Sequence, residues 1–450
     1  MKTSRSSWAL AAVAVLLTDV AVSRAASEKR ASASSNLALS VAIDRADATC
    51  AQGTPVRFTI TVQSDQQPVN DAEVQWTISK DGVPPITEGI VRLTNGSATV
   101  IGRLDEPGFL QCRAVFRGTN QPTRTAVAGA AIDPLLIKPS LPVPADFDAF
   151  WAVQKKKLAA VPVNARLTPV ESAPTNVECF DVQADSLGAP VSGYYARPAG
   201  AQARSLPIIL TVHGAGVRSA SLSGAVGWAG KGMLALDLNA HGLPNGQAES
   251  YYTNLANADL KDYRTRGRES RETIYFLGMF LRLVRAIDFL TAQPEWNGRT
   301  LIVHGSSQGG AQSIVAAGLD PRVSFFAAGV PAMCDHTGVV VGRANGWPKF
   351  LANPPAVPAS NVVEAVRYYD AMNFATRVRC AGIVTVGFID ATCPPTSVYA
   401  AYNALAGPKQ IFNDPPSAHT VSARAAEAMR VAIKAHIEES GRASGPTSKR

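Results

Sequence analysis

The stretch Leu301–Ala311 constrains the fold of this chain more than any other. Its sequence, Leu-Ile-Val-His-Gly-Ser-Ser-Gln-Gly-Gly-Ala, runs from an apolar strand pattern into Gly305-x-Ser307-x-Gly309, and a small-residue helical pattern continues to Leu319. A sharp turn between strand and helix needs small neighbours, because larger side chains would collide there. The pattern therefore predicts a strand–turn–helix unit that exposes a serine above a sheet. The alternative is a glycine-rich turn with an incidental serine.

The surrounding residues 145–440 alternate between buried strands and helices. The expected strands are 177–184, 191–197, 208–212, 233–238, 300–303, 323–330, 382–388 and 410–412, and the expected helices are 146–160, 275–290, 311–319 and 422–438. Buried strands that alternate with helices form parallel sheets covered on both faces. The fold class predicted for this region is therefore α/β, with a doubly wound, mostly parallel sheet.

Residues 37–132 show short segments of period-two alternation instead. Several short strands within about 95 residues predict a small immunoglobulin-like β-sandwich. Asn95-Gly96 lies between two such strands and indicates a two-residue hairpin. The order Cys50, Trp76, Cys112 resembles immunoglobulin spacing, and leaves open a Cys50–Cys112 disulfide or two separately buried thiols. A Pro-rich junction, 133–144, follows.

The two ends of the chain are expected to lie outside the folded part. A basic start, an apolar run of about ten residues and Ser23-Arg24-Ala25 predict a cleavable signal peptide over residues 1–25. Residues 26–36 are expected to be a linker, and 441–450 a disordered tail. We therefore expect a secreted or periplasmic protein with no membrane span, because the only long apolar run is too short to cross a bilayer.

Composition excludes some function classes. The chain carries a formal net charge of +8, but its basic residues are scattered, so we expect no nucleic-acid partner. No His-x-x-x-His, Cys-x-x-Cys or Gly-x-Gly-x-x-Gly pattern occurs, so no metal and no cofactor is expected.

Three residues complete a catalytic hypothesis around the serine turn. A serine hydroxyl needs a base to take its proton, and that base must be oriented by a third group. Asp390 follows the strand 382–388, and His419 follows the strand 410–412. Ligand sites lie at the carboxyl ends of such strands, so Ser307, Asp390 and His419 are predicted to meet there. Asp335, beside His336, is the alternative orienting acid.

The oxyanion of an acyl-transfer intermediate needs backbone amides. The amide of Gln308 opens the helix after Ser307 and is expected to be one donor. His213-Gly-Ala-Gly216 follows a buried strand, at the place where such folds supply a second amide. His213 and His241, each in a glycine-flanked loop, are expected to shape the mouth of the site.

Longer motifs resemble one family of carbohydrate esterases. Gly305-Ser-Ser307-Gln-Gly-Gly310, Val330-Pro-Ala-Met-Cys334, Asp390-Ala-Thr-Cys393-Pro-Pro-Thr-Ser-Val398-Tyr-Ala-Ala-Tyr-Asn403 and Gly407-Pro-Lys409 are similar to the acetyl xylan esterase / cephalosporin C deacetylase family of the α/β-hydrolase superfamily. The resemblance covers roughly residues 145–440. It implies that Ser307 is the nucleophile, Asp390 the orienting acid and His419 the base, with the amides of Gln308 and Ala215 as oxyanion hole.

The chain departs from this family at the mouth of the site. It has Ala215 where the family usually has Tyr, Ala240-His241-Gly242 where Arg-Gly-Gln is usual, and Thr420 where Glu often follows the histidine. We expect aromatic residues of the segment 337–379 to refill the space beside Ala215; these are Trp347, Phe350, Tyr368 and Tyr369.

The function expected from these observations is an exported serine esterase. The resemblance implies removal of acetyl groups from an acetylated saccharide through an acyl-serine intermediate. A general carboxylesterase or a peptidase on the same fold is the alternative enzyme, because a fold does not specify a substrate. A non-catalytic binding protein is the alternative from another class.

Overall fold

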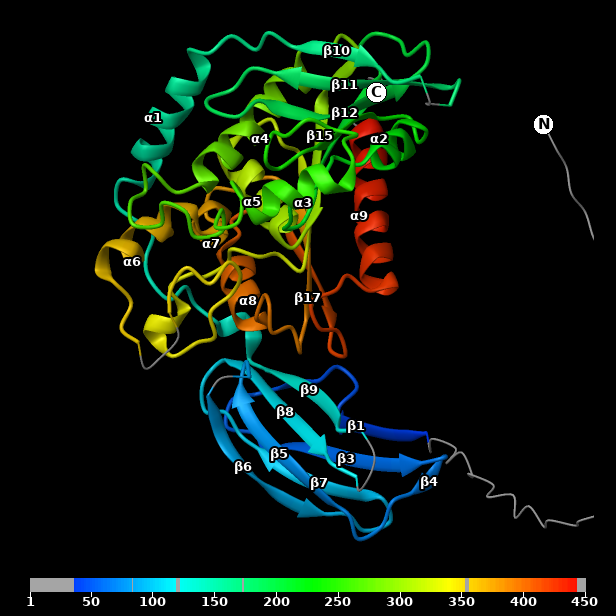
Figure 1. The fold of residues 1–450 in the computed structure, drawn as a ribbon, viewed down its shortest axis with the longest axis vertical. Coiled ribbons are helices and arrows are strands. Elements are labelled where there is room, and N and C mark those ends of the chain that lie inside the picture. The colour runs from blue at the N-terminus through cyan, green and yellow to red at the C-terminus, as the bar shows by residue number, and fades with distance from the viewer. Residues whose placement is uncertain (1–35, 83, 119–121, 172–173, 353–355, 443–450) are drawn as a thin grey trace, which may run out of the picture.

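The computed structural model describes residues 36–442, apart from 83, 119–121, 172–173 and 353–355. The predicted signal peptide and the predicted linker as far as residue 35 lie outside the described residues, as do 443–450. Figure 1 shows two parts: a pair of β-sheets formed by the N-terminal residues, and a larger part with a central sheet covered by helices.

The N-terminal part consists of two sheets that share one core. The four-stranded sheet contains β1 (Leu37–Ile43), β3 (Val56–Ser64), β4 (Gln67–Pro68) and β7 (Ser97–Gly102). The five-stranded sheet contains β2 (Thr49–Cys50), β5 (Glu73–Lys80), β6 (Pro85–Arg92), β8 (Gly108–Phe116) and β9 (Arg124–Ile132). Alternate side chains point inward, and Phe58 and Ile60 of the first sheet share a buried cluster with Ile78 and Leu110 of the second. Two layers of mostly antiparallel strands follow from the alternation, with β2 parallel to β9, whereas the immunoglobulin-like topology stays a prediction.

The predicted hairpin is correct at its turn and wrong in its pairing. Asn95 and Gly96 both have positive φ, 50° and 70°, as a two-residue turn requires. The flanking strands β6 and β7 nevertheless belong to different sheets, where β6 pairs with β5 and β7 with β3. A turn motif specifies a reversal of the chain, and the choice of strand partner depends on packing.

The Cys50–Cys112 disulfide is not formed, and the alternative of two buried thiols holds. All six cysteines, each among the described residues, are free. Cys50 and Cys112 lie in the same sheet, separated by β9, because Cys50 pairs with Ile132 and Cys112 with Ala128. Two strand spacings of about 4.8 Å and four residues along the strand leave the Cα atoms far beyond the ~7 Å that a disulfide tolerates.

The larger part is built on a nine-stranded sheet in the order β10-β11-β12-β14-β13-β15-β16-β17-β18. Its strands are β10 (Arg166–Pro169), β11 (Val177–Ala184), β12 (Val191–Pro198), β13 (Leu206–Val212), β14 (Leu234–Leu238), β15 (Trp296–Ser306), β16 (Phe325–Gly329), β17 (Ala381–Gly387) and β18 (Lys409–Asp414). The first three are antiparallel to their neighbours, and the six from β14 to β18 run parallel. The prediction of a mostly parallel sheet is confirmed.

Helices cover both faces of this sheet, as Figure 1 shows. They are α1 (Phe147–Ala159), α2 (Leu222–Ala229), α3 (Glu249–Asn257), α4 (Phe276–Thr291), α5 (Gln308–Leu319), α6 (Ser360–Val366), α7 (Ala371–Ala375), α8 (Pro395–Ala404) and α9 (Ala423–Arg442), with three short 3-10 helices, Pro134–Leu136, Gly338–Val341 and Arg367–Tyr369. Leu210 and Val303 face a core shared with α1, α4 and α5, whereas Ile209 and Ile302 face a second core with α9. Burial on both faces explains why these strands read as continuous apolar runs.

The last helix extends further than expected. α9 ends at Arg442, so Gly441 and Arg442, assigned by the sequence to a disordered tail, are helical. Among the described residues, no helix combines the length and the apolar composition needed to cross a bilayer.

Candidate active site

Ser307 occupies a strained turn between β15 and α5. Its φ of 57° and ψ of −121° are rarely adopted by a residue with a side chain. Two backbone hydrogen bonds hold the turn: the Ser307 amide donates to the Gly329 carbonyl (2.8 Å), and the Ala332 amide donates to the Ser307 carbonyl (3.0 Å). The strain is therefore imposed by β16 and the loop that follows it.

The glycines around Ser307 allow the backbones to approach closely. A Cβ atom on Gly309 would lie 2.1 Å from the Val212 carbonyl oxygen, and one on Gly305 would lie 2.5 Å from the same oxygen. One on Gly310 would lie 2.8 Å from the Gly329 oxygen. The predicted strand–turn–helix unit thus depends on glycine because the neighbouring strands leave no room for a side chain.

Three predicted residues lie in hydrogen-bonding contact. His419 Nε2 is 2.9 Å from Ser307 Oγ, and His419 Nδ1 is 2.8 Å from Asp390 Oδ2. The carboxylate of Asp390 is 1% exposed, and its Oδ1 accepts the amides of Thr392 and Cys393, each at 2.8 Å. A carboxylate on Nδ1 favours the tautomer whose Nε2 lone pair faces the hydroxyl. These are the contacts that the predicted nucleophile, base and orienting acid require.

The alternative acid, Asp335, is engaged elsewhere. Its carboxylate forms an ion pair with Arg343 (2.8 Å) and accepts the amide of Ser140 (2.9 Å), so it joins the segment 133–144 to this part. Its neighbour His336 is fully buried, and within the part of the chain that the structure describes neither ring nitrogen has a hydrogen-bond partner. The structure therefore brings Asp390, and not Asp335, to His419.

The other histidines form hydrogen bonds that hold parts of the fold together. His304 Nδ1 lies 3.2 Å from the Ala327 carbonyl, and His436 Nε2 lies 2.9 Å from Ser324 Oγ. Burial lowers the pKa of His213 to about 4. Its Nε2 accepts the Ala240 amide (3.1 Å) and its Nδ1 is 2.6 Å from the Gly214 carbonyl oxygen, so the neutral ring ties two loops together.

The loop His213–Gly216 lies next to Ser307, as expected. A Cβ atom on Gly214 would lie 3.6 Å from the Ser307 Cβ. Arg218 Nη2 donates to the carbonyl oxygens of Gly214 (3.0 Å) and Ala215 (2.7 Å), which orients the peptides of this loop. Gln308 is the first residue of α5, so its amide has no partner within the helix.

Tyr263 is a site residue that the sequence did not reveal. Its hydroxyl accepts the Gly216 amide (3.3 Å) and donates to Gln308 Oε1 (3.2 Å). It lies in a segment without a recognisable motif, so only its position in space identifies it. Its ring packs edge-on against His241, with ring centres 4.7 Å apart. His241 is 2% exposed, and burial lowers its pKa to about 3.

The expectation that four aromatics refill the space beside Ala215 is wrong for two of them. Tyr368 packs against Phe147 and Phe150 of α1, and Tyr369 packs against Trp151 of the same helix. The aromatic face of α1 holds both tyrosine rings there. Phe350 packs edge-on against His336 instead. Trp347 lies nearer the site, because its amide donates to the Thr392 carbonyl (2.8 Å).

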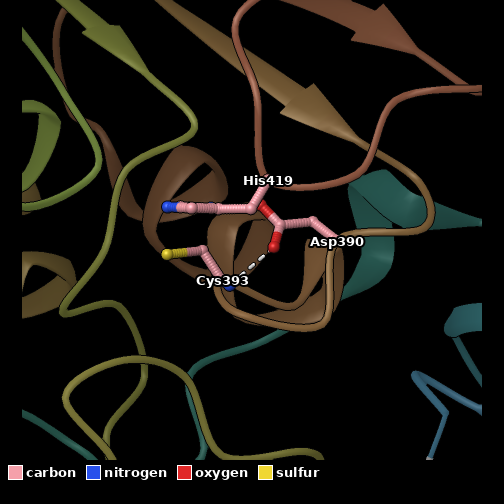
Figure 2. A group of neighbouring side chains, drawn as sticks. All are labelled: Asp390, Cys393 and His419. Atoms are coloured by element: carbon pink, nitrogen blue, oxygen red, sulfur yellow. Dashed lines mark hydrogen bonds and ion pairs between the residues drawn. The ribbon is translucent and has the colours of Figure 1, made fainter.

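Cys393 adds a thiol to the site. Figure 2 shows the ring of His419 and the sulfur of Cys393 pointing the same way, with the Asp390 carboxylate hydrogen-bonded to the Cys393 amide. Burial raises the pKa of this thiol well above its usual value, so it is a neutral neighbour of Ser307. One ligand atom from each of Asp390, Cys393 and His419 lies within 4.8 Å of the others, which resembles a metal-ligand set. The nitrogens of His419 and the oxygens of Asp390 already have protein partners, so we assign no metal to them.

Fold and site together define a class. An open, mostly parallel sheet, with a serine on a strained strand-to-helix turn and an acid and a histidine after later strands, is the α/β-hydrolase arrangement. Two solved structures support this class. The acetyl xylan esterase from Paenibacillus sp. R4 is 29% identical, has a TM-score of 0.58, and the match covers 67% of this chain and 98% of that one. Acetyl xylan esterase 1 from Thermoanaerobacterium sp. JW/SL YS485, 23% identical, has the same TM-score over 67% and 97% of the two chains and supports the fold.

Sequence comparison identifies the family. Residues 136–433 match the acetyl xylan esterase (AXE1) family model. Acetyl esterase Axe7A of Xylanibacter ruminicola is 33% identical over 358 residues, which are 78% of this chain and 79% of the relative. The chain therefore belongs to the acetyl xylan esterase family and is a carboxylic ester hydrolase.

Proposed function

We propose that this protein is a serine esterase that removes acetyl groups from carbohydrate through an acyl-serine intermediate. The observation that carries the proposal is the chain of contacts from Ser307 Oγ through His419 to Asp390, at 2.9 and 2.8 Å. These are the distances at which a histidine can take a serine proton while a carboxylate stabilises the resulting imidazolium.

The proposed reaction has two halves. His419 takes the Ser307 proton as Oγ attacks the ester carbonyl, and the amides of Gln308 and Ala215 stabilise the oxyanion. The intermediate collapses, His419 protonates the departing sugar oxygen, and acetyl-Ser307 remains. Water, deprotonated by His419, then attacks the acyl carbonyl; the bond to Ser307 Oγ breaks, His419 returns the proton to Oγ, and acetate leaves.

An acetylated saccharide is the proposed substrate, supported by the names of the relatives and by family membership. The structure offers a reason for a short acyl group. Tyr263 is hydrogen-bonded to Gly216 and Gln308. An aromatic ring therefore lies beside the loop His213–Gly216, although Ala215 replaces the usual tyrosine. We infer that this ring limits the length of the acyl chain.

The substrate proposal is tested with nitrophenyl esters and an acetylated xylo-oligosaccharide. We expect the acetyl ester to be preferred over the butyryl ester by at least about tenfold in kcat/KM. A short acyl pocket would exclude the longer chain, and this ratio is within the few kcal/mol that a pocket can discriminate. Release of acetate from the oligosaccharide should be measurable by the same enzyme preparation. Equal or rising rates toward butyrate and octanoate would favour the second candidate, a general carboxylesterase, for which the small side chain of Ala215 is the supporting observation.

We further propose that the chain is exported, with cleavage after Ala25, and that residues 37–132 form an immunoglobulin-like domain. The basic start and apolar run of the first 25 residues support export. Expression of the full chain in a bacterial host, followed by fractionation and N-terminal sequencing, tests this directly. The expected mature protein begins at Ala26 outside the cytoplasm. A cytoplasmic protein that keeps its first 25 residues would refute export.

A further inference from the structure

The five-stranded N-terminal sheet touches the loop that carries Asp390. Gln111, on β8 and 6% exposed, donates a hydrogen bond from Nε2 to the Phe388 carbonyl oxygen at 2.8 Å. Phe388 lies between the end of β17 and Asp390, only two residues before the carboxylate. Figure 1 shows the end of β17 directed toward β8 and β9. A side chain 277 positions earlier in the sequence therefore contacts the backbone that presents the proposed acid.

Close packing surrounds this hydrogen bond. The ring of Phe109, the residue two before Gln111, meets Phe388 edge-on with ring centres 4.9 Å apart, and lies 5.4 Å from Tyr399 of α8. A Cβ atom on Gly129 of β9 would lie 2.5 Å from the Phe388 carbonyl oxygen. Phe388 is fully buried, so its peptide cannot shift toward the sheet without a collision.

The turn that follows β5 of this sheet contacts the start of α8, the helix after the Asp390 loop. The hydroxyl of Thr396, six residues after Asp390, donates to Asp81 Oδ1 at 2.8 Å. Thr396 is 1% exposed and Asp81 3% exposed, so this hydrogen bond is buried from solvent. The N-terminal part thus contacts the chain on both sides of Asp390, through Gln111 of β8 before it and through Asp81, next to β5, after it.

The end of β17 also contacts the loop that carries His419. The Ile389 amide donates to the Ser417 carbonyl at 3.2 Å, and a Cβ atom on Gly387 would lie 2.3 Å from the same oxygen. A displacement of Phe388 would therefore move Asp390 and press on the segment two residues before His419. Reacting groups misplaced by about 1 Å can cost on the order of a hundredfold in rate.

We propose that the N-terminal part positions the active site, and that Gln111, through Phe388, and Thr396, through its bond to Asp81, are positioning residues for Asp390. This inference rests on the proposed function, because it assumes that Asp390 orients His419. It gives the N-terminal residues a role in turnover that a spacer would not have.

The test uses the full-length protein and point variants of both contacts. Gln111→Met keeps the length of the side chain and removes its donor; Thr396→Val removes the hydroxyl, and Thr396→Ser restores it. Gln75→Ala, an exposed glutamine on the neighbouring strand β5, is the surface control. Ile78→Val, in the core of the N-terminal sheets, is a control that destabilises without touching Phe388. For each variant, kcat and KM toward 4-nitrophenyl acetate and the Tm are measured.

We expect Gln111→Met and Thr396→Val to lower kcat about three- to thirtyfold with KM unchanged. Thr396→Ser, Gln75→Ala and Ile78→Val should keep wild-type kcat, even where Ile78→Val lowers Tm as much as Gln111→Met. If kcat stays within twofold of wild type in Gln111→Met and Thr396→Val, or if it follows Tm through all variants, the proposal is overturned. Should one of these two variants fail to fold, the other decides.

Ser307→Ala separates this inference from the proposed function. An active wild type with an inactive Ser307→Ala variant, together with unaffected Gln111 and Thr396 variants, would overturn the positioning role and leave the serine mechanism intact. A wild type without esterase turnover, or an active Ser307→Ala variant, would overturn the proposed function and, with it, the inference that rests on it.

Discussion

Ser307 and Asp390 lie at the same edge of the central sheet, yet they are held in place in different ways. The Ser307 turn is shaped by glycines within five residues of it and by the ends of the adjacent strands β13 and β16. The Asp390 loop depends on contacts from Gln111 and Asp81, about 300 residues earlier in the chain. The Ser307 turn is therefore a local motif packed against neighbouring strands, and the Asp390 loop is placed by long-range packing.

The two regions differ in how strongly their conformation restricts the sequence. A strained backbone requires particular small residues at particular spacings, so it leaves a pattern in the sequence. A loop fixed by buried contacts can use many residue types, since only shape and hydrogen bonding are specified. Substitutions in the two regions should consequently affect activity and stability in different ways.

Removal of the nucleophile is expected to have the largest effect. Ser307→Ala should lower kcat by about 10⁴- to 10⁶-fold while the Tm stays near that of the wild type, because only the hydroxyl is lost. Turnover of 4-nitrophenyl acetate and a thermal melt measure the two quantities. A folded variant with a tenth of wild-type activity would mean that another group attacks the ester.

The second prediction separates the two candidate acids. Asp390→Asn should lower kcat by on the order of 10²–10⁴, since the amide cannot stabilise an imidazolium at His419. Asp335→Asn breaks the ion pair with Arg343 and should lower Tm with little change in kcat. Parallel kinetics and melts of both variants provide the comparison. The reverse ranking of kcat would make Asp335 the orienting acid.

The local motif is broken by adding one methyl group. Gly309→Ala would place Cβ 2.1 Å from the Val212 carbonyl oxygen, so the strand β13 or the helix α5 must shift. Overpacking of this kind costs about 1–3 kcal/mol of the free energy of unfolding, and the displaced turn should also lose activity. Gly227→Ala, on α2 with open space around its Cβ position, is the matched control and should melt at or slightly above the wild-type Tm, because alanine favours a helix more than glycine does. Equal Tm and activity in both variants would show that the close approach is not required.

The long-range contact is expected to make stability depend on pH. Burial raises the pKa of Asp81 to about 6 from an unfolded value near 4. The folded state thus holds this proton more tightly, so its contribution to stability is complete below about pH 4 and is lost as pH rises through about 6.

Asp81→Asn should remove this loss, because an amide oxygen still accepts from Thr396 without bearing a charge. The Tm of the variant relative to wild type should increase between pH 4 and pH 8, corresponding to at most about 3 kcal/mol. Asparagine also tolerates the φ of 52° found at this position. A Tm difference that is constant across this pH range would show that Asp81 does not titrate between the folded and unfolded states.

Much of the fold followed from residue patterns. The run Val177–Ala184, for example, is predicted as a strand and has the same bounds in the structure. Helices without a strong apolar stripe, such as α2 and α8, were missed, because they pack between other elements and carry small or mixed residues. The carboxyl ends of parallel strands meet at one edge, so the order Ser307, Asp390, His419 was enough to expect these side chains together.

What the sequence determined by itself is the part encoded by short-range sterics and periodicity: the serine turn, the alternating strands and the mostly parallel sheet. Other features depended on long-range packing: the acid that faces His419, the hydrogen bond of Tyr263 to Gly216, the separation of Cys50 from Cys112, and the contact of Gln111 with Phe388. The physical reason is that these contacts join residues far apart in the chain. Their geometry depends on how whole elements pack, and a single sequence carries no local signal for that.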